Sequence, residues 1–123
     1  MNDDSLLLRQ VHPTFVQNGT ITSQVFRPTP KDENQLSVDN GDKISAKNSF
    51  DRFCSQPDCN SAGVMAVSCK ECKERELEVI EDGVPTPEHC SIDFTGKSRK
   101  QVEKIAKYLK RQATDRGWQY QPS

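Results

Sequence analysis

The stretch Ser98–Gly117, SRKQVEKIAKYLKRQATDRG, decides how this chain folds. It opens with a Ser-x-x-Gln capping box and closes with a cationic turn followed by glycine, the usual start and stop signals of a helix. Apolar residues recur between them at helical spacing: Val102, Ile105, Ala106, Leu109 and Ala113. We therefore predict one long amphipathic helix over 98–116, which needs a sheet or another helix to cover its apolar stripe.

The same helix carries the chain's excess positive charge. Lys97 to Arg116 contains eight Lys or Arg residues and two acidic residues, a net charge of +6, so the remainder carries −7 in a chain of net charge −1. This asymmetry predicts a docking surface for a protein partner, formed by Lys100, Lys104, Lys107, Lys110 and Arg111. The alternative is a solvated outer face that balances the acidic body. Nucleic acid is a disfavoured partner, because the acidic body repels a polyanion and no aromatic residues alternate with the cations.

Upstream of this helix, short β-type segments alternate with turn residues. The expected strands are Leu6–Val11, Thr20–Phe26, Leu36–Asp39, Gly63–Val67, Leu77–Ile80 and Ser91–Phe94, with Asn18-Gly19 as a hairpin turn. Two short helices are expected after the capping serines Ser45 and Ser68, the first with Phe50 and Phe53 on its inner face. We predict one α+β domain over 1–123: a small sheet of five or six mostly antiparallel strands, two short helices and the long C-terminal helix packed on it. Residues 1–5 are expected to be disordered, and 27–35 to form a polar loop.

Composition limits the cellular setting. The chain has 123 residues, of which 33% are hydrophobic, so it can bury one small core. Its acidic N-terminus is followed by only three leucines, unlike a signal peptide, and no apolar run is long enough for a membrane span. We therefore expect a cytoplasmic protein with reduced thiols and no membrane partner.

The five cysteines of the chain are candidates for a metal site or a redox site. Cys54, Cys59, Cys69 and Cys72 supply the four thiolates that structural zinc requires, although the first pair is loosely spaced. A redox motif is a second hypothesis, since Cys69 starts a helix, but Lys-Glu between the thiols and the lack of a βαβ pattern disfavour it. We instead expect Cys72 to be a buried residue that pairs with Val67 in a hydrophobic staple, and we predict no cofactor.

Several segments together resemble a set of small, uncharacterised bacterial proteins. They are Leu8–Pro13, Thr22–Arg27, Leu36–Asp39, Gly63–Val67, Pro87–His89 and Ile92–Phe94, which span most of the chain. The resemblance implies a bacterial origin and brings no activity with it. The proteins of that set lack the cysteine cluster.

A more distant resemblance is to the RES-type toxins, which have the ADP-ribosyltransferase-like fold and consume NAD. Arg9 and the segment Leu36–Ser45 are placed like the arginine strand and the later strand-to-helix unit of those toxins. The resemblance implies an NAD cleft with Arg9 and His12 in it. The chain departs from that pattern, because no glutamate stands in a clear catalytic position and no aromatic platform for nicotinamide is evident.

The sequence thus favours a non-enzymatic binding or accessory module that acts through a protein partner in a bacterial multi-gene system. An NAD-directed enzyme with Arg9 and His12 in its cleft is one alternative. A zinc-stabilised binding domain is the other.

Overall fold

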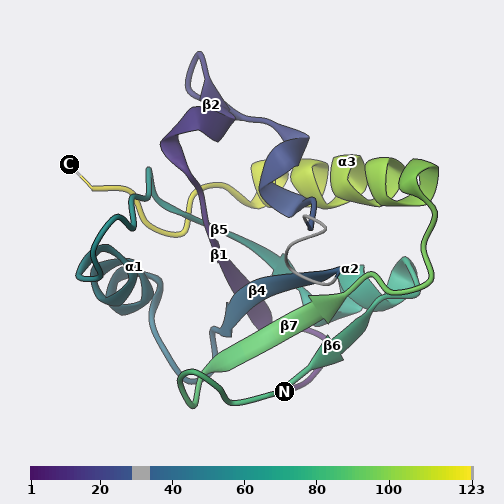
Figure 1. Ribbon diagram of the computed structural model, residues 1–123, viewed down its shortest axis with the longest axis horizontal. Coiled ribbons are helices and arrows are strands. Elements are labelled where there is room, and N and C mark those ends of the chain that lie inside the picture. Colours follow the sequence, from purple (N-terminus) through teal and green to yellow (C-terminus); the bar gives the residue numbers. More distant parts are fainter. Residues whose placement is uncertain (29–33, 123) are drawn as a thin grey trace.

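A five-stranded antiparallel sheet organises the chain, in the strand order β5-β1-β4-β7-β6 (Figure 1). The computed structural model describes residues 1–28 and 34–122. The strands are β1 (Leu6–Gln10), β4 (Gln35–Asn40), β5 (Val64–Ser68), β6 (Glu78–Ile80) and β7 (His89–Asp93). A separate hairpin, β2 (Val16–Gln17) and β3 (Thr20–Ile21), turns at Asn18-Gly19 as predicted. The predicted α+β fold is confirmed.

Three α-helices begin where the sequence predicts. They are α1 (Ala46–Cys54), α2 (Cys69–Glu74) and α3 (Arg99–Arg116). Each begins at a serine whose side chain accepts a hydrogen bond from the backbone N–H three residues on. The capping boxes of α2 and α3 are both complete, and Gly117 ends α3 at a φ of 92° that favours glycine.

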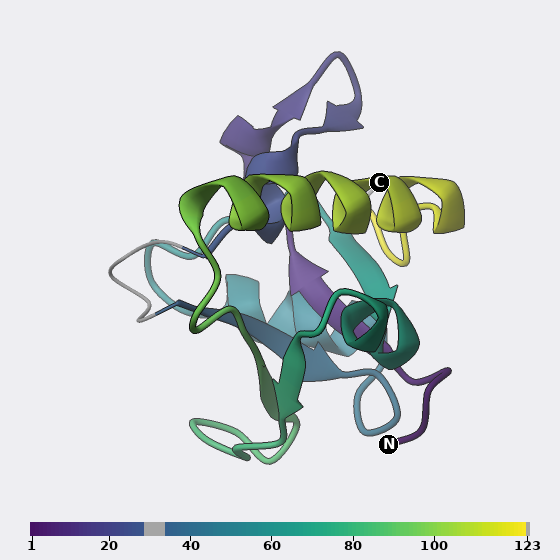
Figure 2. The ribbon, with the colours of Figure 1, turned by 90° about the vertical axis from the view of Figure 1, so that its right-hand side faces the viewer.

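Helix α3 lies across one face of the sheet, as the apolar stripe predicted (Figure 2). Ile105, Ala106, Leu109 and Ala113 are buried in the main core, together with residues from β1, β4, β5 and β7. Cys72 and Val67 are both fully buried in this core, as expected of a staple pair. The main core therefore consists of aliphatic residues, thiols and the two fully buried rings of Phe26 and Phe94.

The opposite face has a smaller apolar cluster, centred on Leu8, Val64 and Ala66 beneath α1. Phe50 and Phe53 are both half-buried, and Phe50 packs against this cluster. The only fully buried residue of α1 is Ser49. The C-terminal tail closes this side, because Val64 exchanges backbone hydrogen bonds with Gln119 and Tyr120. Helix α1 contacts β1 and β5, at one end of the sheet, and the outward residues of β4 are polar.

The predicted strand Thr20–Phe26 is wrong beyond Ile21. Ser23–Phe26 forms a 3-10 helix, η2, which packs against α3. Val25 and Phe26 are both buried, at 1% and 0% exposed. In a strand, consecutive side chains point to opposite faces, so only a helical turn lets both adjacent residues enter the core here.

The predicted loop at 27–35 lies largely outside the described residues, and Gln35 belongs to β4. Residues 1–5, for which the sequence predicts disorder, instead form a turn with defined contacts. The Ser5 hydroxyl donates to the Asp42 carboxylate, and Lys73 pairs with Asp3 at 2.7 Å. Across residues 1–28 and 34–122, no helix is long and apolar enough to cross a membrane.

Candidate functional site

A cleft of about 360 Å³ opens on the sheet face beside α1. One wall is α1, and the loop before β7 also lines the cleft. The 3-10 helix η1 (Pro13–Phe15) contributes Phe15. The walls are partly apolar and partly polar, as in most small-molecule sites.

Strand register builds the floor of this cleft. Leu8 of β1 pairs with Asp39 of β4, and Asp39 pairs with His89 of β7. Alternation along β4 turns Val38 into the core and leaves Ser37 exposed on the cleft side. Residues distant in sequence thus share one row across three strands.

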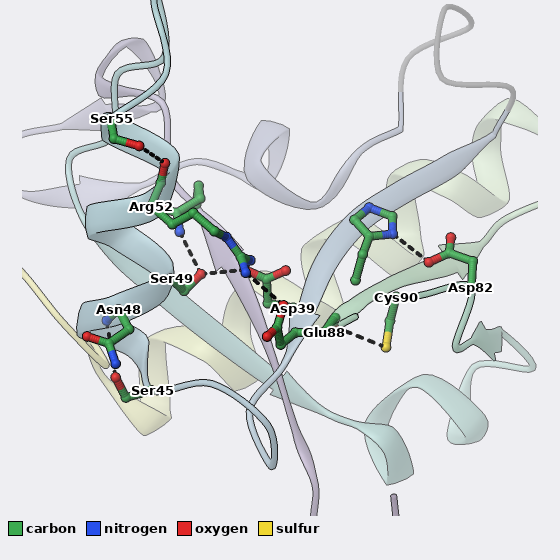
Figure 3. A network of polar contacts seen from close by, with 11 residues as sticks. Asp39, Ser45, Asn48, Ser49, Arg52, Ser55, Asp82, Glu88 and Cys90 are labelled. Carbon is green, nitrogen blue, oxygen red and sulfur yellow. Dashed lines mark hydrogen bonds and ion pairs between the residues drawn. The ribbon is translucent and has the colours of Figure 1, made fainter. Parts of the chain in front are cut away.

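Arg52 of α1 is the centre of a polar network that closes one side of the cleft (Figure 3). Its guanidinium donates to Asp39 and to Glu88, each at 2.8 Å. Two carboxylates therefore neutralise this cation and attach α1 to β4 and to the residue before β7. Because Arg52 is 32% exposed and its partners 15% and 22%, the network is partly shielded from water.

A second chain of hydrogen bonds runs from Asp39 into β1. The Ser49 hydroxyl donates to Asp39 at 2.6 Å and accepts from the Gln10 amide at 3.0 Å. The Gln10 oxygen Oε1 is then buried with no hydrogen-bond partner among the described residues. Such an atom is unusual in a folded protein, where nearly all buried polar groups are satisfied.

His89 is held by an acidic residue outside the sheet. Its Nδ1 lies 2.6 Å from Asp82, whose other oxygen accepts from Ser91 at 2.8 Å. Burial raises the pKa of Asp82, but the hydrogen bonds from His89 and Ser91 outweigh it, so that the pKa is lowered overall. Asp82 is therefore a carboxylate that orients the His89 ring.

The structure brings the sequence-predicted pair Arg9 and His12 to the same cleft. Arg9 donates from Nε to the Val25 carbonyl at 3.0 Å and from Nη1 to the Ser37 carbonyl at 2.9 Å. These bonds connect β1 to η2 and β4. His12 is exposed, and its Nδ1 accepts from the Thr14 backbone N–H at the start of η1.

A second concave site, which we call the basic groove, lies between α3 and the β2–β3 hairpin. Its volume is about 570 Å³, and it is lined by Thr20, Thr22, Ser23, Lys107, Lys110, Arg111, Thr114 and Asp115. Three of the five predicted partner-binding cations therefore share it, while Lys100 and Lys104 lie exposed nearer the start of α3. The Thr22 hydroxyl is buried without a hydrogen-bond partner among the described residues.

The cysteines lie in different environments. Cys54 is exposed and Cys59 half-buried, whereas Cys69, Cys72 and Cys90 are buried, and all five are free thiols. Burial raises the pKa of Cys72 to about 12 and that of Cys90 to about 11. Within the described ranges, no group of three or more His, Cys, Asp or Glu side chains is placed to hold a metal ion.

Sequence reasoning missed four polar residues that line the cleft, Gln10, Asp39, Arg52 and His89, together with Asp82, which contacts His89. No motif marks them, since they come from β1, β4, α1 and the segment around β7. Comparison of the chain with known protein families, curated proteins and solved structures finds no match. Its function must therefore be argued from these two sites.

Proposed function

We propose that this protein is a non-enzymatic cytoplasmic binding module that docks an acidic segment of a protein partner along the basic face of α3. Lys107, Lys110 and Arg111 in the groove form the centre of the surface. Lys100 and Lys104 extend it toward the start of the helix. In a bacterial multi-gene system, such a module would act as an accessory to its partner.

The single observation that supports this proposal is that cations without an ion-pair partner among the described residues cluster on α3. Elsewhere on the chain many cations form ion pairs, including Arg27 with Glu103 and Lys73 with Asp3. The five cations of the α3 surface form none with any described residue. Unpaired like charges on one helix repel each other, so an acidic partner that neutralised them would bind favourably.

Helical geometry supports the same surface. Lys100, Lys104, Lys107 and Arg111 follow i, i+4, i+7 and i+11 spacing, which places them along one face of the helix. The core residue Leu109 lies about 200° around the axis from Lys107, on the opposite face. The cations therefore face away from the sheet while the helix remains fully packed.

Peptide binding tests the proposal directly. A fluorescein-labelled peptide of eight glutamates serves as the probe, and its anisotropy is followed at low salt. We expect the double variant K107A/R111A to weaken binding about tenfold, because two desolvated charges at a partner surface contribute this much together. The matched control is K43A/K70A, which removes two cations that form no ion pair with a described residue elsewhere.

Equal loss in both variants, or no binding of the peptide at low salt, would contradict the proposal. An eight-residue oligothymidylate is the second probe. If it bound more tightly than the peptide and lost the same affinity in K107A/R111A, the surface would be assigned to nucleic acid instead.

One observation favours the NAD-directed alternative: Arg9 and His12 line the same cleft. Against it, the Arg9 guanidinium is engaged by backbone carbonyls, and no described glutamate lines that cleft. Incubation with NAD, followed by measurement of released nicotinamide, separates the two functions. Nicotinamide release that disappears in R9K would establish the enzyme.

A further inference from the structure

The cleft beside α1 belongs to neither the basic groove nor the core, and its polar groups are set in a specific pattern. Arg52, its central cation, is already neutralised by Asp39 and Glu88. The other guanidinium, that of Arg9, is held by the Val25 and Ser37 carbonyls. Both guanidinium groups of the cleft are therefore already engaged by groups of the protein itself, so we expect the cleft to bind an uncharged ligand in preference to an ion.

Two histidines give the cleft a complementary donor and acceptor. At His12, Nδ1 accepts from a backbone N–H, so in the neutral ring Nε2 carries the hydrogen and is a donor. At His89, Nδ1 donates to the Asp82 carboxylate, so in the neutral ring Nε2 is an acceptor. Neither Nε2 atom has a hydrogen-bond partner among residues 1–28 and 34–122.

Gln10 adds a third fixed group. Ser49 has one hydroxyl hydrogen, which it gives to the charged Asp39 oxygen, so it accepts from Gln10 and must face the amide nitrogen. The orientation of the amide is thereby determined, and its oxygen is left as a buried acceptor without a donor. An unsatisfied acceptor of this kind costs roughly 1–3 kcal/mol, which an N–H donor from a ligand or water would recover.

Flat apolar side chains complete the cleft. Phe15 lies against the His12 ring at a centroid separation of 5.9 Å, and Phe53 of α1 lines the wall together with Pro85. The planar rings of Phe15 and Phe53 can stack on a planar ligand, and Pro85 adds apolar contact. At about 360 Å³, the cleft has room for a one- or two-ring molecule.

We propose that this cleft binds a small uncharged molecule whose planar ring carries an N–H donor beside a carbonyl acceptor, the edge of a nucleobase or another cyclic amide. The ligand carbonyl accepts from His12 Nε2, and the ligand N–H donates to His89 Nε2. The site is independent of the basic groove, so either can be disproved without the other.

A series of three single-ring compounds tests the proposal on the unaltered protein by two-dimensional ¹H–¹⁵N NMR titration. Uracil presents the donor beside the acceptor. In 1,3-dimethyluracil both ring N–H groups are replaced by N-methyl groups while the carbonyls remain, and orotate adds a carboxylate to the uracil ring. We expect uracil to shift amide resonances of Ser37–Asp39 and Thr86–His89, with at least tenfold weaker binding of 1,3-dimethyluracil and no gain in affinity for orotate.

Protein variants locate the contact. H12F and H89F keep a ring of similar size but remove the nitrogen atoms, and each should weaken uracil binding about tenfold, while K107A/R111A should leave it unchanged. Three results would overturn the proposal: equal binding of uracil and 1,3-dimethyluracil, more than tenfold tighter binding of orotate, or no uracil shifts at the cleft. The ligand comparison needs no variant, so a folding defect in H89F would not obscure the result.

Discussion

The contact between Arg116 and Glu71 gives the sharpest stability prediction, because it links the end of α3 to the start of α2. Arg116 donates to both Glu71 oxygens, at 3.1 and 2.9 Å, and to the Ala66 carbonyl at 2.9 Å. Glu71 also accepts from the Ser68 backbone N–H at 2.7 Å, which completes the capping box. The two side chains are 26% and 12% exposed.

The magnitude follows from this burial. An exposed ion pair contributes about 0–1 kcal/mol, whereas removal of one partner from a buried pair costs about 3–5 kcal/mol. Since this pair is bidentate and partly shielded, we expect R116Q to lower the free energy of unfolding by about 2 kcal/mol. At about 2.1 cal/mol/K of unfolding entropy per residue, a chain of 123 residues would lose about 8 °C in Tm.

Urea unfolding of R116Q, E71Q and the double variant at pH 7 measures the coupling. E71Q keeps an oxygen that can accept from Ser68, so the cycle isolates the charge–charge contact with Arg116. We expect a coupling energy of about 1–1.5 kcal/mol. The control is R99Q, because Arg99 forms an exposed pair with Glu103 on the same helix and should cost under about 0.5 kcal/mol.

The pH dependence provides an independent check. Burial raises the pKa of Glu71, but the hydrogen bonds from Arg116 and Ser68 outweigh it and lower the pKa. A carboxylate whose folded pKa lies below its unfolded value of about 4.3 stabilises the fold above that pH, and this contribution is lost as pH falls through the folded pKa. The wild type should therefore lose stability below about pH 4.3 more steeply than E71Q. A coupling below about 0.3 kcal/mol, with parallel pH curves for the two proteins, would refute the reasoning.

Three further predictions address the core, the tail and the thiols. L109A removes a fully buried side chain of α3 and should lower the free energy of unfolding in urea by about 3 kcal/mol. The control K107A, at an exposed position, should lower it by under about 0.5 kcal/mol, and similar losses in the two variants would mean that α3 is not packed as described. In G63A the added Cβ would lie 2.6 Å from the Tyr120 carbonyl oxygen and 2.9 Å from the Trp118 indole. The variant should therefore lose about 1–3 kcal/mol of stability and shift Trp118 fluorescence to the red, and an unchanged spectrum would contradict this. A thiol reagent should label Cys54 and Cys59 in the native protein and the other three cysteines only after unfolding. A chelator should change neither the number of labelled cysteines nor Tm. If fewer cysteines were labelled in the native protein and their number rose on chelation, the zinc alternative would be restored.

Local signals predicted the framework well. The caps at Ser45, Ser68 and Ser98 depend on residues within one helical turn, so a single sequence contains all the information that they need. The failure at Thr20–Phe26 has the opposite cause. A β-branched run favours a strand locally, but contact with α3 places Val25 and Phe26 in the core through a 3-10 turn.

The cleft could not be predicted in this way, because its contacts are long-range. Arg52 meets Glu88 across 36 residues, and the row from Leu8 to Asp39 to His89 depends on strand order. The basic groove could be predicted from the sequence in part. Its cations are evident from helical spacing, while Thr20 and Thr22 reach it only because the β2–β3 hairpin lies beside α3.

The backbone hydrogen bonds of Val64 with Gln119 and Tyr120 occupy the outer margin of β5. An uncovered strand margin is a template on which other chains can polymerise. By pairing Gln119 and Tyr120 with Val64, the chain blocks that part of the margin against an added strand from a neighbouring molecule. Shortening the chain before Gln119 should therefore promote self-association through β5, visible as concentration-dependent light scattering, even while the α3 core stays intact.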